Sequence, residues 1–339
     1  MARAVWEKLT SDPSIQRSSQ AVSVVNNNTY IYGGELRPRE PVNSSIYRIQ
    51  LHSALPSDVQ ITLLPSTGPS PQPRVGTAST TIGDRIYLFS GRGGVAMAPL
   101  EEDGSLWVFD TKTIFWSQLT PAAGTPFPQG RSYHALTSNG TDTIYLHAGC
   151  PTTDRLSDLW AFDITSKVWR ELPSAPGPAR GGTSITFSNG KIYRMNGFDG
   201  KTEQGGALDI FDVSNNEWRT ITFAADGISG PEARSVGALL AVTISGRESL
   251  VTLFGERDPS SLGHAGAGKM LGDVWVFDIK DQKWGEISVC EGESAKPAAR
   301  GWFDADVVDL NGGRSGIVVH GGLAESNERL GDVWVLELE

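Results

Sequence analysis

The chain has 339 residues, with 39 acidic and 29 basic side chains and a net charge of −10, so a general affinity for nucleic acid or an anionic membrane is excluded as its main function. Its two cysteines, Cys150 and Cys290, are too few for a disulfide scaffold and are typical of a reducing compartment. The start, MARAVWEKLT, lacks the apolar core of a secretion signal, and the apolar run ALLAVTI is far shorter than the ~20 residues of a membrane helix. We therefore expect a cytoplasmic protein without nucleic-acid or membrane partners.

Short strands that end in glycine recur along the whole chain. The 39 glycines, 19 prolines and 10 tryptophans favour an all-β fold with many tight turns. In chain order the strands are YIYGG (ending at Gly34), YLFSG (Gly91), YLHAG (Gly149), YRMNG (Gly197), VTLFG (Gly255) and VVHGG (Gly322). An arginine precedes each strand, at positions Arg17, Arg74, Arg131, Arg180, Arg234 and Arg300. The chain therefore consists of six copies of one unit.

A second pattern completes the unit. The segments LWVFDTKTIFW, LWAFDITSKVW, LDIFDVSNNEW and VWVFDIKDQKW each hold an aspartate and, six residues later, a tryptophan. The aspartate is typical of a side chain that caps a turn, and the tryptophan is typical of packing between units. Each unit is thus predicted to contain four strands.

Six units of roughly 50 residues resemble kelch repeats, which form the blades of β-propellers. The resemblance predicts a single domain over residues 1–339, a six-bladed propeller with four-stranded blades. The last unit stops after GDVWVLELE, its third strand, and AVWEKL at the start of the chain has the pattern of the missing fourth strand. We expect this N-terminal strand to join the last blade and close the ring, which leaves no exposed sheet edge.

One face of the predicted ring carries most of the variation. The arginine begins the first strand of a unit and the glycine ends the second, so both lie on one face, together with the loop that follows the glycine. From glycine to the next strand this loop spans 11 residues in the third unit (Gly149 to Trp160) but 20 in the fifth (Gly255 to Trp275). Features that break the repeat on this face are candidates for function.

Arginines supply the first candidates. The six repeated arginines are expected to bond between strands, although Arg131 is also a candidate for contact with a ligand. Arg92 and Arg155 differ, because each follows a unit glycine in one unit only. A guanidinium suits sulfate, phosphate or carboxylate, since its planar fork donates hydrogen bonds in pairs. We predict that Arg92, Arg155 and Arg131 bind a small anionic molecule.

The long fifth loop, FGERDPSSLGHAGAGK, supplies the second candidates. Glu256, Asp258 and His264 lie within nine residues, and two carboxylates with one imidazole can bind Fe(II) and leave positions open for substrate. The alternative is a loop stabilised by its own hydrogen bonds, because Asp258 before Pro259 and Ser260 is good turn chemistry.

The chain also resembles the plant specifier proteins that form nitriles, epithionitriles or thiocyanates, in FGERDPSSLGHAGAGK and in ARGWFDADVVDLNGGRSGIVVHGGLAESNERLGDVW. That family implies a six-bladed kelch propeller that acts with Fe(II) on thiohydroximate-O-sulfates released from glucosinolates. Its iron ligands are a Glu, an Asp four residues later and a His four residues further. Glu256 and His264 match this spacing, whereas Ser260 stands at the middle position and Asp258 is the nearest carboxylate.

The resemblance extends to the substrate. Arg92 matches the arginine with which the family holds sulfate, and Arg155 corresponds loosely to a second one. The resemblance therefore implies a lyase or isomerase-like enzyme with Fe(II) at Glu256, Asp258 and His264. Two alternatives stay open: a non-catalytic kelch module that binds a protein through the same face, and a metal-free enzyme that uses acid–base chemistry.

Overall fold

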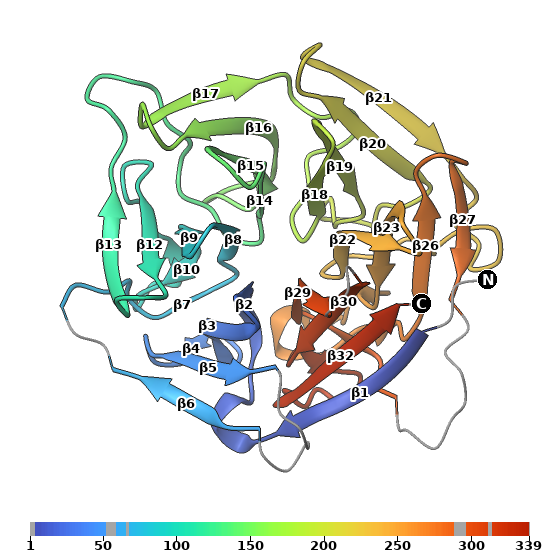
Figure 1. Cartoon of the computed structure of the whole chain (residues 1–339), viewed down its shortest axis with the longest axis horizontal. Coiled ribbons are helices and arrows are strands. Elements are labelled where there is room, and N and C mark those ends of the chain that lie inside the picture. Colours follow the sequence, from blue (N-terminus) through green and yellow to red (C-terminus); the bar gives the residue numbers. More distant parts are fainter. Residues whose placement is uncertain (1–3, 52–58, 66–67, 288–295, 311–313, 339) are drawn as a thin grey trace.

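The computed structural model describes residues 4–51, 59–65, 68–287, 296–310 and 314–338, and Cys290 lies outside them. The predicted all-β class is confirmed: the described elements are strands apart from two single-turn 3-10 helices, η1 (Pro13–Ile15) and η3 (Gly263–Ala265). The strands gather into sheets arranged around a common centre (Figure 1). In the part of the chain that is described, we find no helix of the length and apolarity that a membrane crossing requires.

Six antiparallel sheets carry the architecture, and we number them along the chain from the innermost strand outward. Sheet one contains β2 (Ser18–Val25), β3 (Asn28–Arg37), β5 (Ile46–Gln50) and β6 (Ile61–Leu64), with β4 (Glu40–Pro41) beside β3. Sheet two contains β8 (Ala78–Ile82), β9 (Arg85–Phe89), β12 (Leu106–Asp110) and β13 (Phe115–Leu119). Sheet three contains β14 (Ala135–Ser138), β15 (Thr143–Gly149), β16 (Leu156–Asp163) and β17 (Val168–Leu172).

The second half of the chain repeats this order. Sheet four contains β18 (Ser184–Ser188), β19 (Lys191–Met195), β20 (Ala207–Asp212) and β21 (Glu217–Thr222). Sheet five contains β22 (Ala238–Ile244), β23 (Arg247–Leu253), β26 (Val274–Asp278) and β27 (Lys283–Glu286). Sheet six contains β29 (Asp304–Leu310), β30 (Arg314–His320), β32 (Asp332–Leu338) and β1 (Ala4–Ser11).

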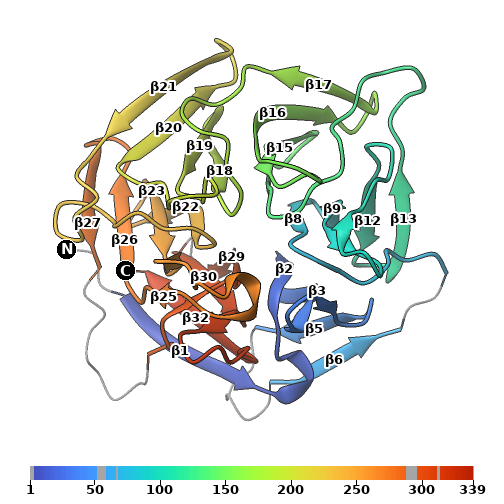
Figure 2. The same ribbon diagram turned by 180° about the vertical axis from the view of Figure 1, so that it is seen from behind.

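Short strands lie in the loops between the sheets. Three such strands, β7 (Arg74–Val75), β10 (Arg92–Gly93) and β11 (Ala98–Pro99), pair beside sheet two. Two further two-stranded ribbons lie in the loops of sheets five and six. They are β24 (Glu256–Arg257) with β25 (Lys269–Met270), and β28 (Arg300–Gly301) with β31 (Leu323–Ala324). Seen from behind, the loop beside β25 reaches toward the middle of the molecule (Figure 2).

Six backbone hydrogen bonds join the six units into a closed cycle, which we call the mouth ring. Its members each stand two residues after a repeated arginine: Ser19, Gly76, Tyr133, Gly182, Val236 and Trp302. The N–H of each member donates to the carbonyl of the member before it, and Ser19 N–H donates to the Trp302 carbonyl at 2.7 Å, which completes the cycle. All six have positive φ, between 47° and 61°, a conformation that is uncommon for residues other than glycine. Residues of five different types therefore adopt the same left-handed backbone conformation at the six positions of the mouth ring.

The repeated arginines anchor this arrangement. In all six units the arginine Nη1 donates to the carbonyl of the residue before the unit glycine, at 2.8–3.2 Å. In four units the guanidinium also pairs with a carboxylate, which accepts a further hydrogen bond from a tryptophan Nε1 at 2.7–2.8 Å. These arginine clamps are Arg74–Glu102–Trp107, Arg131–Asp158–Trp160, Arg234–Asp273–Trp275 and Arg300–Asp332–Trp334. These contacts agree with the expectation that the repeated arginines bond between strands and stabilise the fold.

The other two units depart from the clamp. The guanidinium of Arg17 lies 4.8 Å from the centre of the Tyr47 ring, so an aromatic face takes the place of the carboxylate. In the fourth unit Asp209 occupies the position of the tryptophan and pairs with Arg194 of the neighbouring strand β19 at 2.6 Å. Arg180 bonds only to the Pro178 and Asn196 carbonyls among the described residues.

The two ends of the chain meet in sheet six. Strand β1 pairs antiparallel with β32, from Ala4 opposite Leu338 to Ser11 opposite Asp332. Trp6 of β1 is 3% exposed and stacks on Phe254 of sheet five, with ring centroids 5.7 Å apart. The N-terminal strand thus carries an aromatic residue into the contact between two sheets, as the repeated tryptophans do elsewhere.

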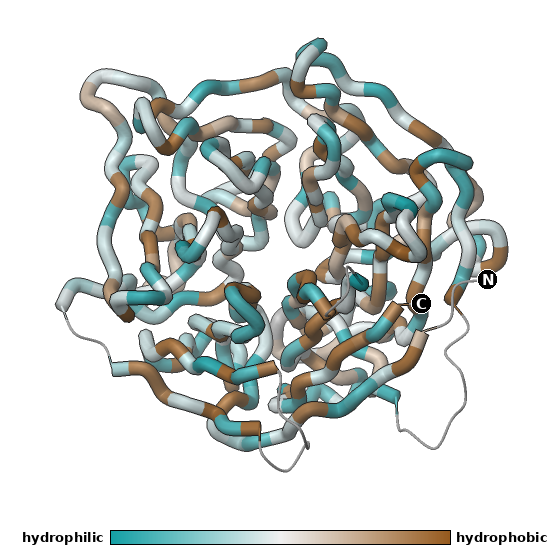
Figure 3. Tube along the Cα trace, in the orientation of Figure 1, coloured by the Kyte–Doolittle hydropathy of each residue, from teal (hydrophilic) through white to brown (hydrophobic). Residues whose placement is uncertain are grey.

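The predicted turn caps are also present. Asp110, Asp163, Asp212 and Asp278 each end a third strand, and each carboxylate accepts the N–H groups two and three residues later. Apolar stretches lie mainly along the strands (Figure 3), and they form buried clusters between neighbouring sheets rather than one central core. The core therefore surrounds the centre and leaves room there for polar groups.

Candidate functional site

A cavity of about 310 Å³ lies on the face that carries the post-glycine loops, and we call it the mouth pocket. Four consecutive sheets contribute to it, each through the loop after its unit glycine: Arg92 from sheet two, Arg155 from sheet three, Glu203 from sheet four and Glu256 from sheet five. Tyr133 and Trp302 of the mouth ring also line it, and their rings meet edge to face with centroids 5.2 Å apart. The loops that break the repeat therefore share one cavity.

Arg92 and Arg155 line the mouth pocket without a carboxylate partner among the described residues. The Nε atom of each is buried without a hydrogen-bond partner, and neither guanidinium forms an ion pair with any described residue. By contrast, Arg74, Arg131, Arg234 and Arg300 are at most 1% exposed and each pairs with a carboxylate. The side chains are half-buried, and each Nε–H is a buried donor that no described residue satisfies.

Sheet four holds Arg155 in position. Its guanidinium lies 5.2 Å from the centre of the Phe198 ring. A Cβ atom at Gly200 would come within 2.7 Å of the Arg155 Nη1, and Gly200 has a φ of 101°. Glycine at this position therefore lets the arginine of one unit rest on the loop of the next.

Arg131 does not share this role, which corrects the sequence-based assignment. It is 1% exposed, pairs with Asp158 at 2.7 Å and donates to the Ala148 and Gln129 carbonyls. It is also not among the residues that line the mouth pocket. Its donors are taken up by the clamp, so Arg131 supports the fold and the unpaired Arg92 and Arg155 face the cavity.

Glu256 lines the mouth pocket, and hydrogen bonds hold its side chain in place. It is 4% exposed, its Oε1 accepts the Gly268 N–H at 2.7 Å, and its Oε2 accepts the Trp302 Nε1–H at 3.0 Å. A Cβ atom at residue 268 would come within 2.7 Å of the Asp258 carbonyl oxygen, so glycine is required where the loop passes Glu256. Burial raises the pKa of Glu256, while the two N–H groups oppose that rise. The long fifth loop thus folds back on its own first residue.

Glu203 provides the second carboxyl group of the pocket, and the sequence analysis missed it. Its Oε1 is buried without a hydrogen-bond partner. Burial raises the pKa of Glu203, and the nearby charges of Glu256 and Asp258 raise it further. The loop that carries it is firmly built, because Phe198 and Glu203 form a β-bridge and Gln204 N–H donates to the Gly197 carbonyl at 2.7 Å.

The three predicted iron ligands are placed differently from one another. Glu256 lines the pocket, but the Asp258 side chain is 77% exposed, lies 3.8 Å from Arg257 and is not part of the lining. Ser260 is part of the lining. His264 belongs to η3, and its side chain lies outside the described residues. No group of three His, Cys, Asp or Glu side chains suited to a metal occurs among the side chains that are described, which do not include that of His264.

Cys150 also faces the mouth pocket. Burial raises the pKa of its thiol, and the positive charges of Arg155 and Arg92 reduce that rise. The thiol is therefore largely protonated at neutral pH and acts as a small apolar wall.

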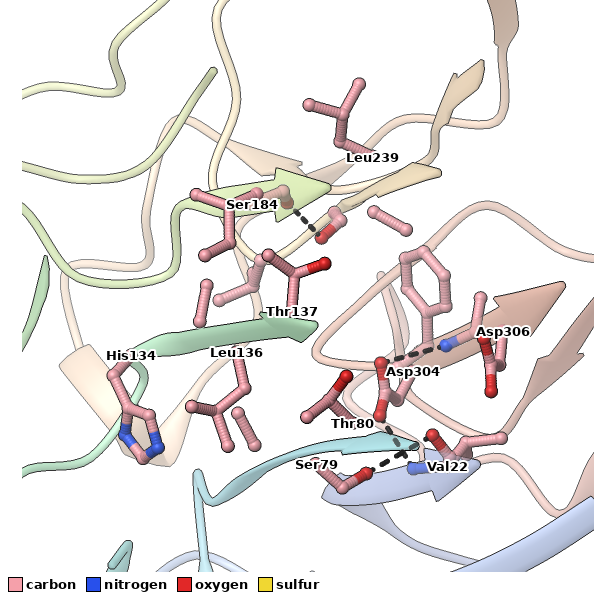
Figure 4. Close-up of a pocket in the computed structure, with 18 of the residues that line it drawn as sticks. Val22, Ser79, Thr80, His134, Leu136, Thr137, Ser184, Leu239, Asp304 and Asp306 are labelled. Atoms are coloured by element: carbon pink, nitrogen blue, oxygen red, sulfur yellow. Dashed lines mark hydrogen bonds between the residues drawn. The ribbon is translucent and has the colours of Figure 1, made fainter. Parts of the chain in front are cut away.

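A second cavity, of about 240 Å³, runs along the innermost strands below the mouth ring (Figure 4). Two aspartates of β29 reach across to β2: Asp304 Oδ2 accepts the Val22 N–H at 2.6 Å, and Asp306 Oδ2 accepts the Val24 N–H at 2.7 Å. Burial raises the pKa of Asp304 to about 7 and that of Asp306 to about 6. These side chains link the first and last sheets where the backbones of the two strands are not paired.

The fold and the site define a class of protein, a β-propeller with a polar pocket at its mouth. The solved structure of YjhT is similar over 97% of this chain and 99% of that chain, with a TM-score of 0.69 and 15% sequence identity, which is a likeness of fold. The KLHDC2/KLHL20/DRC7 Kelch-repeats domain family matches residues 2–197. The chain belongs to the kelch-repeat family.

Individual relatives extend this result. The N-(sulfonatooxy)prop-2-enimidothioate sulfolyase of Thlaspi arvense is 26% identical over 343 residues, which cover 94% of this chain and 91% of that protein. Kelch domain-containing protein 2 of Bos taurus is 30% identical over 39% of this chain and 32% of its own length. Rab9 effector protein with kelch motifs, also of Bos taurus, is 30% identical over 45% of this chain and 39% of its own length. The match to the sulfolyase agrees with the predicted resemblance to plant specifier proteins.

The central aspartates predict how stability depends on pH. The pKa of Asp304 is higher in the folded chain than the value of about 4 in an unfolded one, so its contribution is complete below pH 4 and is lost as the pH rises through about 7. We expect the free energy of unfolding to fall by on the order of 2 kcal/mol between pH 5 and pH 8. Asp304→Asn should reduce this fall, measured by urea unfolding at both pH values. Asp309→Asn, an exposed position on the same strand, is the control and should leave it unchanged.

Proposed function

We propose that the chain is an enzyme of the specifier-protein type, which binds a small sulfated or carboxylated substrate in the mouth pocket and acts as a lyase. The observation that carries this proposal is the pair of unpaired guanidinium groups, Arg92 and Arg155, in a pocket of about 310 Å³. The similarity to the Thlaspi arvense sulfolyase over 94% of the chain supports the choice of a sulfated group and of a lyase reaction.

The pocket residues suit the departure of an anion. Negative charge on a leaving sulfate would increase as its bond to the substrate breaks, and two guanidinium groups already fixed in place would stabilise that charge. The Phe198 ring and the Gly200 backbone hold Arg155 in place before the substrate arrives. The side chains of Cys150, Phe198 and Trp302 supply a largely apolar wall for the rest of a small substrate.

A second candidate function is supported by the rim of the same face. Val95 and Leu262 lie in the post-glycine loops of sheets two and five, and they are 109% and 71% exposed. Exposed apolar side chains around a polar pocket are typical of surfaces that bind proteins. The relative named as a Rab9 effector shares the kelch motifs, so a protein partner on this face is the alternative to the enzyme.

If Arg92 binds the anionic group of the ligand, replacing it with lysine should weaken binding. Arg92→Lys keeps the charge but removes the planar pair of donors, so binding of a sulfonate such as ethanesulfonate should weaken by about 1–3 kcal/mol. Isothermal titration calorimetry of both proteins measures this difference. The matched control is Arg219→Lys, an exposed arginine of the outer strand β21, which should bind as the wild type does. Equal affinity in the Arg92 variant would remove the proposed anion site and favour the protein-binding function.

Iron dependence stays a prediction that rests on the family resemblance. If Glu256, Asp258 and His264 bind Fe(II), His264→Ala should abolish binding, because the imidazole is the only nitrogen donor of the predicted set. Ser260 lines the mouth pocket, whereas Asp258 does not, so Ser260→Asp should strengthen binding. Anaerobic titration with Fe(II) compares the three proteins. A wild type that binds no iron, together with a Ser260→Asp variant that gains none, would leave the metal-free enzyme.

We also propose that the six sheets act as six blades of one ring and that β1 closes it. The pairing of β1 with β32, the buried Trp6 and the cycle of hydrogen bonds in the mouth ring support this closure. Removal of residues 1–10 should lower the melting temperature of the whole domain. Trp6→Ala should cost about 3–5 kcal/mol, as buried aromatic truncations do, and Glu7→Ala, exposed on the same strand, should cost little. An unchanged melting temperature in the truncated protein would contradict closure by β1.

A further inference from the structure

The mouth pocket is lined by both cationic and acidic side chains. Arg92 comes from sheet two and Arg155, next to Asp154, from sheet three, whereas Glu203 and Glu256 come from sheets four and five. Neither arginine forms an ion pair with either glutamate, although all four line one cavity of about 310 Å³. Opposite charges that share a cavity without pairing leave both kinds of group available to a ligand.

We propose that the ligand of the mouth pocket is zwitterionic, with its anionic group on Arg92 and Arg155 and a cationic nitrogen on Glu203. The inference deepens the proposed function, on which it rests, because it specifies the other end of the small anionic substrate. It makes Glu203 a residue that determines specificity.

Glu203 has a carboxylate oxygen that can still accept a hydrogen bond from a ligand. Both oxygens of Glu256 already accept hydrogen bonds, from Gly268 and from Trp302. The Oε1 of Glu203 is buried and accepts none. A buried acceptor without a donor is uncommon in folded proteins and costs free energy, so its presence in a cavity wall indicates a donor that arrives with the ligand.

The charge around Glu203 specifies the kind of donor. Burial raises the pKa of Glu203, its own backbone N–H lowers it, and the charges of Glu256, Asp258 and Asp199 raise it, so the surroundings disfavour the charged form of this carboxyl group. A neutral N–H would satisfy the free oxygen but would leave this repulsion in place. A cationic nitrogen satisfies the oxygen and also offsets the repulsion between the two glutamates.

The loop of sheet four fixes the distance between the two ends of the ligand. Phe198, which supports the Arg155 guanidinium, forms the β-bridge with Glu203. Asp199 stabilises the turn between them by accepting the N–H groups of Lys201 and Thr202 at 2.7 and 2.8 Å. One rigid hairpin therefore positions both an arginine and the glutamate, so the pocket selects ligands by the separation of their charges.

Three sulfonates test the proposal by calorimetry at pH 7. Ethanesulfonate carries the anion alone, taurine adds an ammonium group, and homotaurine places that ammonium one methylene further away. Wild-type protein should bind taurine or homotaurine about tenfold or more tightly than ethanesulfonate, as expected for a charged hydrogen bond, and should distinguish the two lengths. Glu203→Gln should lower the ratio of aminosulfonate to ethanesulfonate affinity to about one, because only the aminosulfonates carry a cationic nitrogen for this carboxylate.

Ethanesulfonate binding also reports whether the Glu203→Gln variant is folded, and Glu328→Gln, an exposed glutamate in a loop of sheet six, is the matched control. If ethanesulfonate binds and neither aminosulfonate binds more tightly, the zwitterionic ligand is wrong and the anion pocket stands. If none of the three binds, the anion pocket fails and the inference fails with it. A preference that survives in Glu203→Gln would assign the ammonium to another group and overturn the role of Glu203.

Discussion

Six hydrogen bonds between backbone groups of the mouth ring determine how the rest of the molecule is arranged. Five of them join neighbouring units, and the sixth joins Ser19 of the first unit to Trp302 of the last. Each requires a residue in the left-handed region of φ. Glycine meets that requirement easily, yet Tyr133, Val236 and Trp302 meet it as well. A non-glycine residue adopts this conformation only when its surroundings stabilise it, so the arginine clamps and the ring depend on one another.

The clamps supply that stabilisation from below the ring. A buried guanidinium donates to the carbonyl that precedes each unit glycine, and in four sheets a carboxylate and a tryptophan complete the contact. Such groups are costly to bury singly, but the clamp satisfies their donors and acceptors together. The six repeated arginines thus have partners within their own unit, whereas Arg92 and Arg155 form no ion pair with a described residue.

The mouth pocket uses the same scaffold for a different purpose. Its charged residues lie in loops of four neighbouring sheets, so the ring determines which loops meet, and the loops determine which charges meet. Glu256 is fixed by its own loop and by Trp302 of the ring, whereas Glu203 keeps a free oxygen. The presence of cationic and acidic side chains in one cavity is therefore a property of loop order around the ring, and it would suit a small polar molecule.

The sequence by itself determined the strands, the six repeats and the face whose loops break the repeat. These depend on local patterns: alternation along a strand, aspartates at turns such as Asp163, and an arginine and a glycine at fixed positions in each unit. It also separated Arg92 and Arg155 from the repeated arginines, because both break the repeat.

Only the tertiary structure decided the composition of the pocket. Glu203 lies in a short loop that shows no unusual spacing, and its role depends on the approach of Arg155 and Glu256 from other sheets. The direction of Asp258 away from the pocket depends on a local φ of 50° and on its contact with Arg257. The nine-residue spacing that suggested a ligand set therefore says how near these residues are along the chain, whereas the path of the folded loop decides which of them share a cavity.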